Sequence, residues 1–172
     1  MRPPTSSLMV LVALGLSPAA HAGEPTVSPQ LGEIRRLVGN WSGKGTIHTE
    51  GKSHGVTMTW DCVESSGAAG VRCKGQINGL PGFTYQFDDL WGYSDVDRLV
   101  HWFTVTNAGE VHDHRGHLDA TGGLLQFDGA MDGKLFTETI LFKRKARSMT
   151  MSWTSTLGGA PRERGEIELT TK

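Results

Sequence analysis

The segment EVHDHRGH, residues 110–117, is the densest group of side chains that could bind a metal ion or transfer a proton. Neutral imidazole is a common ligand of zinc, copper and nickel, so this run of histidines makes a metal site a candidate. In a regular strand His112 and His114 project from the same face, with Cα atoms about 7 Å apart. We therefore take His112 and His114 as candidate metal ligands. A metal-binding protein or metal-dependent enzyme is the alternative to a barrel that binds a small molecule.

The same segment also fits an ordinary polar strand. Asp113 and Arg115 alternate with the two histidines, as side chains on a solvated outer face would. His117 falls on the opposite face unless Gly116 forms a bulge, and His101, on the preceding predicted strand, is a further candidate ligand. A metal site and an exposed polar strand are both compatible with the sequence.

Catalysis has less support than binding. His112 together with Glu110 or Asp113 could act as a general base, because imidazole titrates near neutral pH. The sequence has no serine nucleophile elbow, no HExxH motif and no paired-cysteine nucleophile. The glycine-rich string GNWSGKGT, residues 39–46, lacks the spacing of a phosphate-binding loop. We expect a binding protein rather than an enzyme, and the sequence names no cofactor.

Short strands must position these side chains. Residues 29–38 place apolar side chains at helical spacing after Ser28, a suitable N-cap, and therefore predict a short helix. From there on the pattern has period two, and glycine-rich turns separate the runs. The predicted strands lie near 40–48, 54–63, 71–78, 83–93, 97–105, 111–118, 123–129, 134–143, 147–156 and 163–171.

Ten strands with short connections favour an all-β, antiparallel up-and-down barrel, because closure leaves no exposed edge strand. A barrel of this size can enclose a ligand. The apolar faces of three strands would provide the wall of a site for a small hydrophobic or amphipathic molecule. The expected ligand-binding residues are Met58, Trp60, Phe83, Tyr85, Phe87, Met151 and Trp153. A core filled by the same side chains is the other interpretation.

Two cysteines provide a sharper test of the strand pairing. Cys62 and Cys73 flank a turn at residues 65–70, and a four-residue loop there places them directly opposite each other. Cross-strand Cβ atoms about 4.5 Å apart are compatible with a disulfide. The same register puts Trp60 opposite Gly75. We predict a structural disulfide, which would fit an oxidising compartment.

The N-terminal segment has the features of a targeting signal rather than of a folded element. Arg2 precedes the apolar run LMVLVALGL, and Ala20-His21-Ala22 fits a signal-peptide cleavage site after Ala22. We expect residues 1–22 to be a signal peptide, residues 23–172 to be a single barrel domain, and the protein to be periplasmic or secreted. A formal net charge of −1 gives no basic surface for nucleic acid, and no second apolar run is long enough to span a membrane.

Two segments carry a resemblance to known proteins. LVGNWSGKGTI, residues 37–47, resembles the opening of calycin-type barrels, in which a Gly-x-Trp sequence lies at the first strand. FDDLWGYSDVDRLVHWFTVTNAGEVHDHRGHLD, residues 87–119, resembles an uncharacterised lipocalin-like bacterial family of small barrels. The resemblance implies a ten-stranded calycin-like barrel that binds a small molecule. It also implies that Trp41 plugs the closed end.

Overall fold

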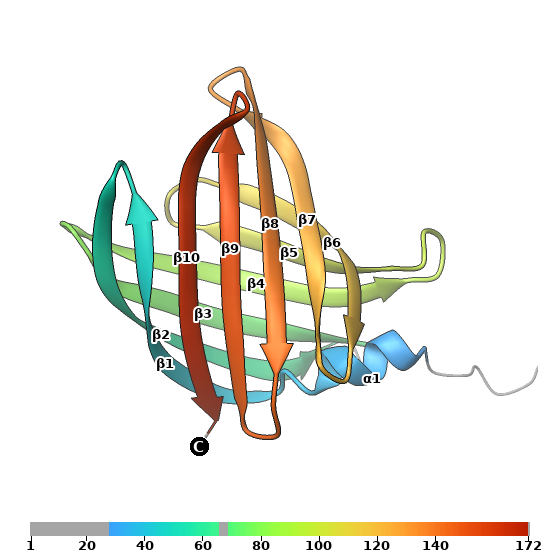
Figure 1. Ribbon diagram of the computed structural model, residues 1–172. Helices are drawn as coiled ribbons and strands as arrows, with labels where there is room; N and C mark the ends of the chain where they lie inside the picture. The colour runs from blue at the N-terminus through green and yellow to red at the C-terminus, as the bar shows by residue number, and fades with distance from the viewer. Residues whose placement is uncertain (1–27, 66–68, 172) are drawn as a thin grey trace, which may run out of the picture.

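The alternating runs form strands that close into an antiparallel barrel in the computed structural model, which describes residues 28–65 and 69–171 (Figure 1). The predicted signal peptide and its cleavage position at Ala22 lie outside the described residues. The elements are α1 (Pro29–Arg35), β1 (Gly39–Thr49), β2 (Lys52–Ser65), β3 (Gly70–Leu80), β4 (Phe83–Ser94), β5 (Leu99–Thr106), β6 (Val111–Asp119), β7 (Gly122–Met131), β8 (Lys134–Arg144), β9 (Ser148–Leu157) and β10 (Ala160–Thr171).

Each strand pairs with its neighbour in sequence, and β10 returns to pair with β1. This is the up-and-down order that the short turns favour, and no described strand is left with a free edge. The predicted ten-stranded barrel with a short N-terminal helix is confirmed.

Helix α1 lies against the end of the barrel where β6 and β8 finish (Figure 1). The side chain of Ser28 accepts a hydrogen bond from the Gln30 N–H, as expected of an N-cap. The Gln30 side-chain amide bonds both backbone groups of Leu118, at 2.6 and 2.8 Å. Arg144 donates to the carbonyl and the carboxylate of Glu33. These contacts fasten the helix across one end of the barrel.

The helix ends at Arg35, before the predicted end at Val38. A turn then carries Leu37 into the core, where it is 1% exposed. Its carbonyl accepts a hydrogen bond of 2.7 Å from the indole of Trp41 on β1, in place of the backbone N–H that would bond it in a longer helix. Trp41 is buried beside this turn, and its role as a plug of the closed end stays a prediction.

Aromatic rings fill the interior beyond the helix. Trp91 and Trp102 stack with centroids 4.7 Å apart, and both lie 6.0 Å from Trp60. The indole N–H of Trp60 donates to Asp89 at 2.7 Å, and the Thr104 hydroxyl donates to the other oxygen of the same carboxylate at 2.8 Å. This half of the barrel is therefore a packed core that surrounds one buried acid.

The cysteine pair confirms the predicted register. Cys62 lies opposite Cys73 and is joined to it by a disulfide, and Trp60 lies opposite Gly75. Both cysteines are at most 1% exposed. The bond thus connects β2 to β3 within the packed core.

Candidate functional site

A cavity of about 290 Å³ opens into the barrel at the end away from α1. Its size is close to the lower limit of ligand pockets, about 300 Å³. The apolar part of its wall is made by Ile47, Met58, Ile77, Leu80, Phe83, Phe87, Trp102, Ala108, Phe136, Ile140, Met151 and Trp153. Polar groups come from Tyr85, Thr104, Glu110, His112, His114, Glu138, Ser155, Arg162 and Glu163. The barrel is filled at one end and hollow at the other.

Six of the seven predicted ligand-binding residues line this cavity: Met58, Phe83, Tyr85, Phe87, Met151 and Trp153. Phe83 lies at the rim and is 42% exposed, although its alternation with Phe87 predicts an inward position. Trp60 is not part of the lining, because it lies in the packed core and bonds Asp89. The part these residues play in binding a ligand stays a prediction.

Two glycines allow the aromatic wall to lie flat. Gly75 faces Phe87 across β3 and β4, and a Cβ atom on this glycine would come within 2.3 Å of the phenyl ring. Gly165 faces Trp153 across β10 and β9, and a Cβ atom there would come within 2.2 Å of the indole. Both rings therefore lie flat against the glycine backbone of the neighbouring strand. In this position they occupy less of the barrel interior.

The histidines of β6 point into the barrel, and the structure adds a third group to them. His112 and His114 are 8% and 2% exposed. Glu138, on β8, lies with its Oε2 atom 2.7 Å from Nε2 of His114 and 3.5 Å from Nδ1 of His112. Burial opposes the charge on Glu138, but hydrogen bonding and charge from the two histidines outweigh it and lower the pKa of this carboxyl to about 2. Glu138 is therefore an ionised carboxylate inside the cavity.

Aromatic neighbours fix both imidazole rings. His112 stacks on Phe127 of β7 with centroids 4.5 Å apart, and His114 lies 5.1 Å from Trp102. Nδ1 of His114 is buried without a hydrogen-bond partner among the described residues. The ring positions are thus set by packing, while one nitrogen is left without a protein partner.

A second polar group lies nearer the mouth of the cavity. The Tyr85 hydroxyl donates to Glu110 at 2.8 Å, and Arg162 lies 3.7 Å from the same carboxylate. The Trp153 indole donates to Glu163 at 2.7 Å. Burial and the charge of Glu110 raise the pKa of Tyr85, and burial raises the pKa of Glu163 despite the bond from Trp153. Among the described residues Arg162 is the only lysine or arginine in the lining, where three carboxyl side chains outnumber it.

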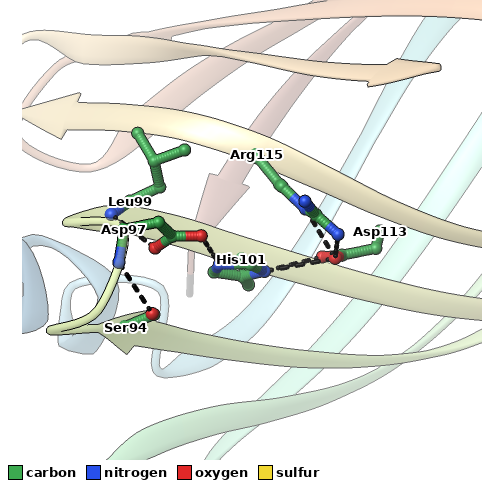
Figure 2. A network of polar contacts seen from close by, with 6 residues as sticks. All are labelled: Ser94, Asp97, Leu99, His101, Asp113 and Arg115. Atoms are coloured by element: carbon green, nitrogen blue, oxygen red, sulfur yellow. Dashed lines mark hydrogen bonds and ion pairs between the residues drawn. The ribbon is translucent and has the colours of Figure 1, made fainter.

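The remaining histidines of this region are not part of the cluster. His101 lies between the carboxylates of Asp97 and Asp113, at 2.9 and 3.0 Å, and Arg115 bonds Asp113 (Figure 2). His117 is exposed. The structure therefore does not bring His101 or His117 to His112 and His114. The segment is a metal-ligand candidate on its inner face and a solvated polar strand on its outer face.

Glu138 is not among the residues predicted from the sequence, although its position in the strand carries a signal. It alternates with Phe136 and Ile140, so period two places it on the inward face. A charged residue at an inward position requires a partner. Its neighbours lie two strands away, and only the β6–β7–β8 pairing identifies them.

These features define the class of protein as a closed, ten-stranded, calycin-like barrel with an internal cavity. Among solved structures the chain resembles the S-type phycobiliprotein lyase CPES of Guillardia theta, with a TM-score of 0.56 and 10% sequence identity over 81% of this chain and 90% of that one. At this identity the likeness concerns the fold alone. No protein-family model matches the sequence, and no curated protein matches it. Membership of the bacterial lipocalin-like family stays a prediction.

Within residues 28–65 and 69–171, none of the helices has the length and apolar character needed to cross a membrane.

Proposed function

We propose that this protein is an exported binding protein that holds one small amphipathic molecule inside its barrel. The main support for the proposal is the cavity. The packed core closes it toward the α1 end of the barrel, and most of its wall is apolar. Export is supported by the signal-like N-terminus and by the Cys62–Cys73 disulfide, since disulfides persist in oxidising compartments. The phycobiliprotein lyase supports the barrel as a scaffold and does not identify a ligand for this chain.

The charge of the cavity narrows the class of ligand. Apolar side chains from β1 to β5, β8 and β9 share the lining with imidazoles of β6 and with carboxylates of β8, β10 and the turn before β6. Glu138 is ionised, and a carboxylate ligand placed near it would meet a like charge in a region of low dielectric. A medium-length apolar body with a hydroxyl or amine head group fits better than a fatty acid. The small volume also favours such a ligand over a long-chain lipid.

The head-group preference is tested with three probes of equal chain length. In chelator-treated buffer, decanol and decylamine are expected to quench tryptophan fluorescence saturably, and decanoate is expected to bind at least about tenfold more weakly, which is about 1.4 kcal/mol. Trp153→Ala removes part of the wall and is expected to weaken decanol binding about tenfold.

Leu90→Ala is the matched control, because Leu90 is 49% exposed on the barrel exterior, and it is expected to leave binding unchanged. Glu138→Gln is expected to remove most of the discrimination against decanoate. The proposal would be abandoned if no saturable binding occurred across a panel of alcohols, amines, isoprenoids, fatty acids and tetrapyrroles.

A further inference from the structure

Three potential metal ligands meet at one point on the cavity wall. Each of His112, His114 and Glu138 offers an atom that lies within 4.8 Å of the atoms offered by the other two. The histidines come from β6 and the glutamate from β8, so the barrel pairing itself brings them together. We propose that these three side chains bind one divalent transition-metal ion of the zinc class, and leave a coordination position open to the cavity.

The donor set is the first argument. Two imidazoles and one carboxylate are a common protein ligand set for zinc, with the fourth position left for water or another ligand. Nitrogen and oxygen donors of this kind also accept nickel and copper. The ligands lie beside a cavity rather than in a solid core, so the fourth position has room for an incoming group.

The distances are the second argument. Tetrahedral coordination at about 2.0–2.1 Å would place neighbouring donor atoms about 3.3–3.4 Å apart. The observed separations from Glu138, 2.7 Å to His114 and 3.5 Å to His112, lie on either side of this value. Phe127 stacks on His112 and Trp102 is tilted against His114, and these contacts orient both imidazoles toward Glu138. Small rotations would therefore bring the donor atoms to the ion.

Proton placement is the third argument. Both ring nitrogens of His101 face carboxylates, which leaves that ring no nitrogen free for a metal (Figure 2). In His114 only Nε2 has a partner, and Nδ1 has none among the described residues. Nδ1 can therefore carry the ring proton while Nε2 coordinates, and no protein hydrogen bond at Nδ1 is lost. Glu138 would exchange its bond to His114 for the ion.

Charge is the fourth argument. The cavity lining holds three carboxylates, those of Glu110, Glu138 and Glu163, close enough to interact with one another. Arg162, the one lysine or arginine in the lining, pairs with Glu110 near the mouth. Arg162 can neutralise one carboxylate of the lining. A divalent cation held by His112, His114 and Glu138 would neutralise the negative charge that remains.

The experiment uses zinc alone, so its outcome is independent of whether the cavity binds an organic ligand. The protein, without a histidine tag and freed of metal by chelator and dialysis, is titrated with ZnCl₂ in a calorimeter. We expect one equivalent to bind with a dissociation constant on the order of 1 µM or lower. Cobalt substituted at the site is expected to give the visible absorption of a four-coordinate ion.

Variants identify the ligands. His114→Ala and Glu138→Gln are each expected to weaken zinc binding at least about tenfold. His117→Ala, on the same strand but exposed, is the matched control and is expected to bind as the wild type does. If His114→Ala does not fold, the near-isosteric Glu138→Gln and the cobalt spectrum decide the question. The proposal is overturned if the wild type binds no zinc, if Glu138→Gln binds it unchanged, or if His117→Ala loses it.

Discussion

Replacing Cys62 and Cys73 together with alanine is expected to lower the free energy of unfolding by about 3 kcal/mol. The bond closes a short loop, with a sequence separation of 11, and so restricts the unfolded chain. It also lies in the packed core, where both sulfur atoms are buried. Urea denaturation of the double variant and of the oxidised wild type measures the difference.

Reductant provides the control for this result. The wild type with reductant should unfold close to the midpoint of the double variant, and reductant should not move the midpoint of the variant. Equal midpoints for the oxidised wild type and the double variant would show that the bond adds nothing to stability.

Asp89 is expected to make stability fall as the pH rises through weakly acidic values. Its side chain is 2% exposed, and burial raises the pKa to about 6 against the opposing bonds from Thr104 and Trp60. Between about pH 4 and pH 6 the folded protein therefore holds a proton that the unfolded chain releases. The contribution of this group is full below about pH 4 and is lost as the pH rises through about 6, a total change of about 3 kcal/mol.

The test is Asp89→Asn, which cannot ionise and retains an oxygen to accept the Trp60 bond. Urea denaturation of both proteins from pH 4 to pH 8 should show the wild type losing about 3 kcal/mol relative to the variant as the pH rises. Asp128→Asn, at an exposed position on β7, should reproduce the wild-type profile. A difference between wild type and Asp89→Asn that stayed constant over this range would disprove the assignment.

The fold could be predicted because its signals are local. Alternation of apolar and polar residues gave the strands, and glycine-rich turns gave their order. The pair Cys62 and Cys73 gave one complete register, including the position of Trp60 opposite Gly75. Since each strand pairs with its neighbour in the chain, no long-range pairing had to be inferred except the closure itself.

The site could be predicted only in part, because it depends on relations between distant strands. Alternation placed His112 and His114 on one face but did not say whether that face was the inner one. Glu138 joins them across β7, and this contact has no local signature. Alternation also does not predict how far along the barrel axis a residue lies. Trp60 and Phe87 both point inward, but only Phe87 lines the cavity.

The pairing of β1 with β10 also determines the order in which the barrel can assemble. Every other pair is a hairpin whose partners are adjacent in sequence, whereas this one joins the first strand to the last. Contacts between distant parts of a chain form slowly, because ordering the intervening residues costs entropy before the contact forms. Until β1 and β10 pair, each of these two strands presents a row of unpaired backbone groups that can recruit another chain. We expect refolding yield to fall as protein concentration rises, with closure of the ring as the step that competes with aggregation.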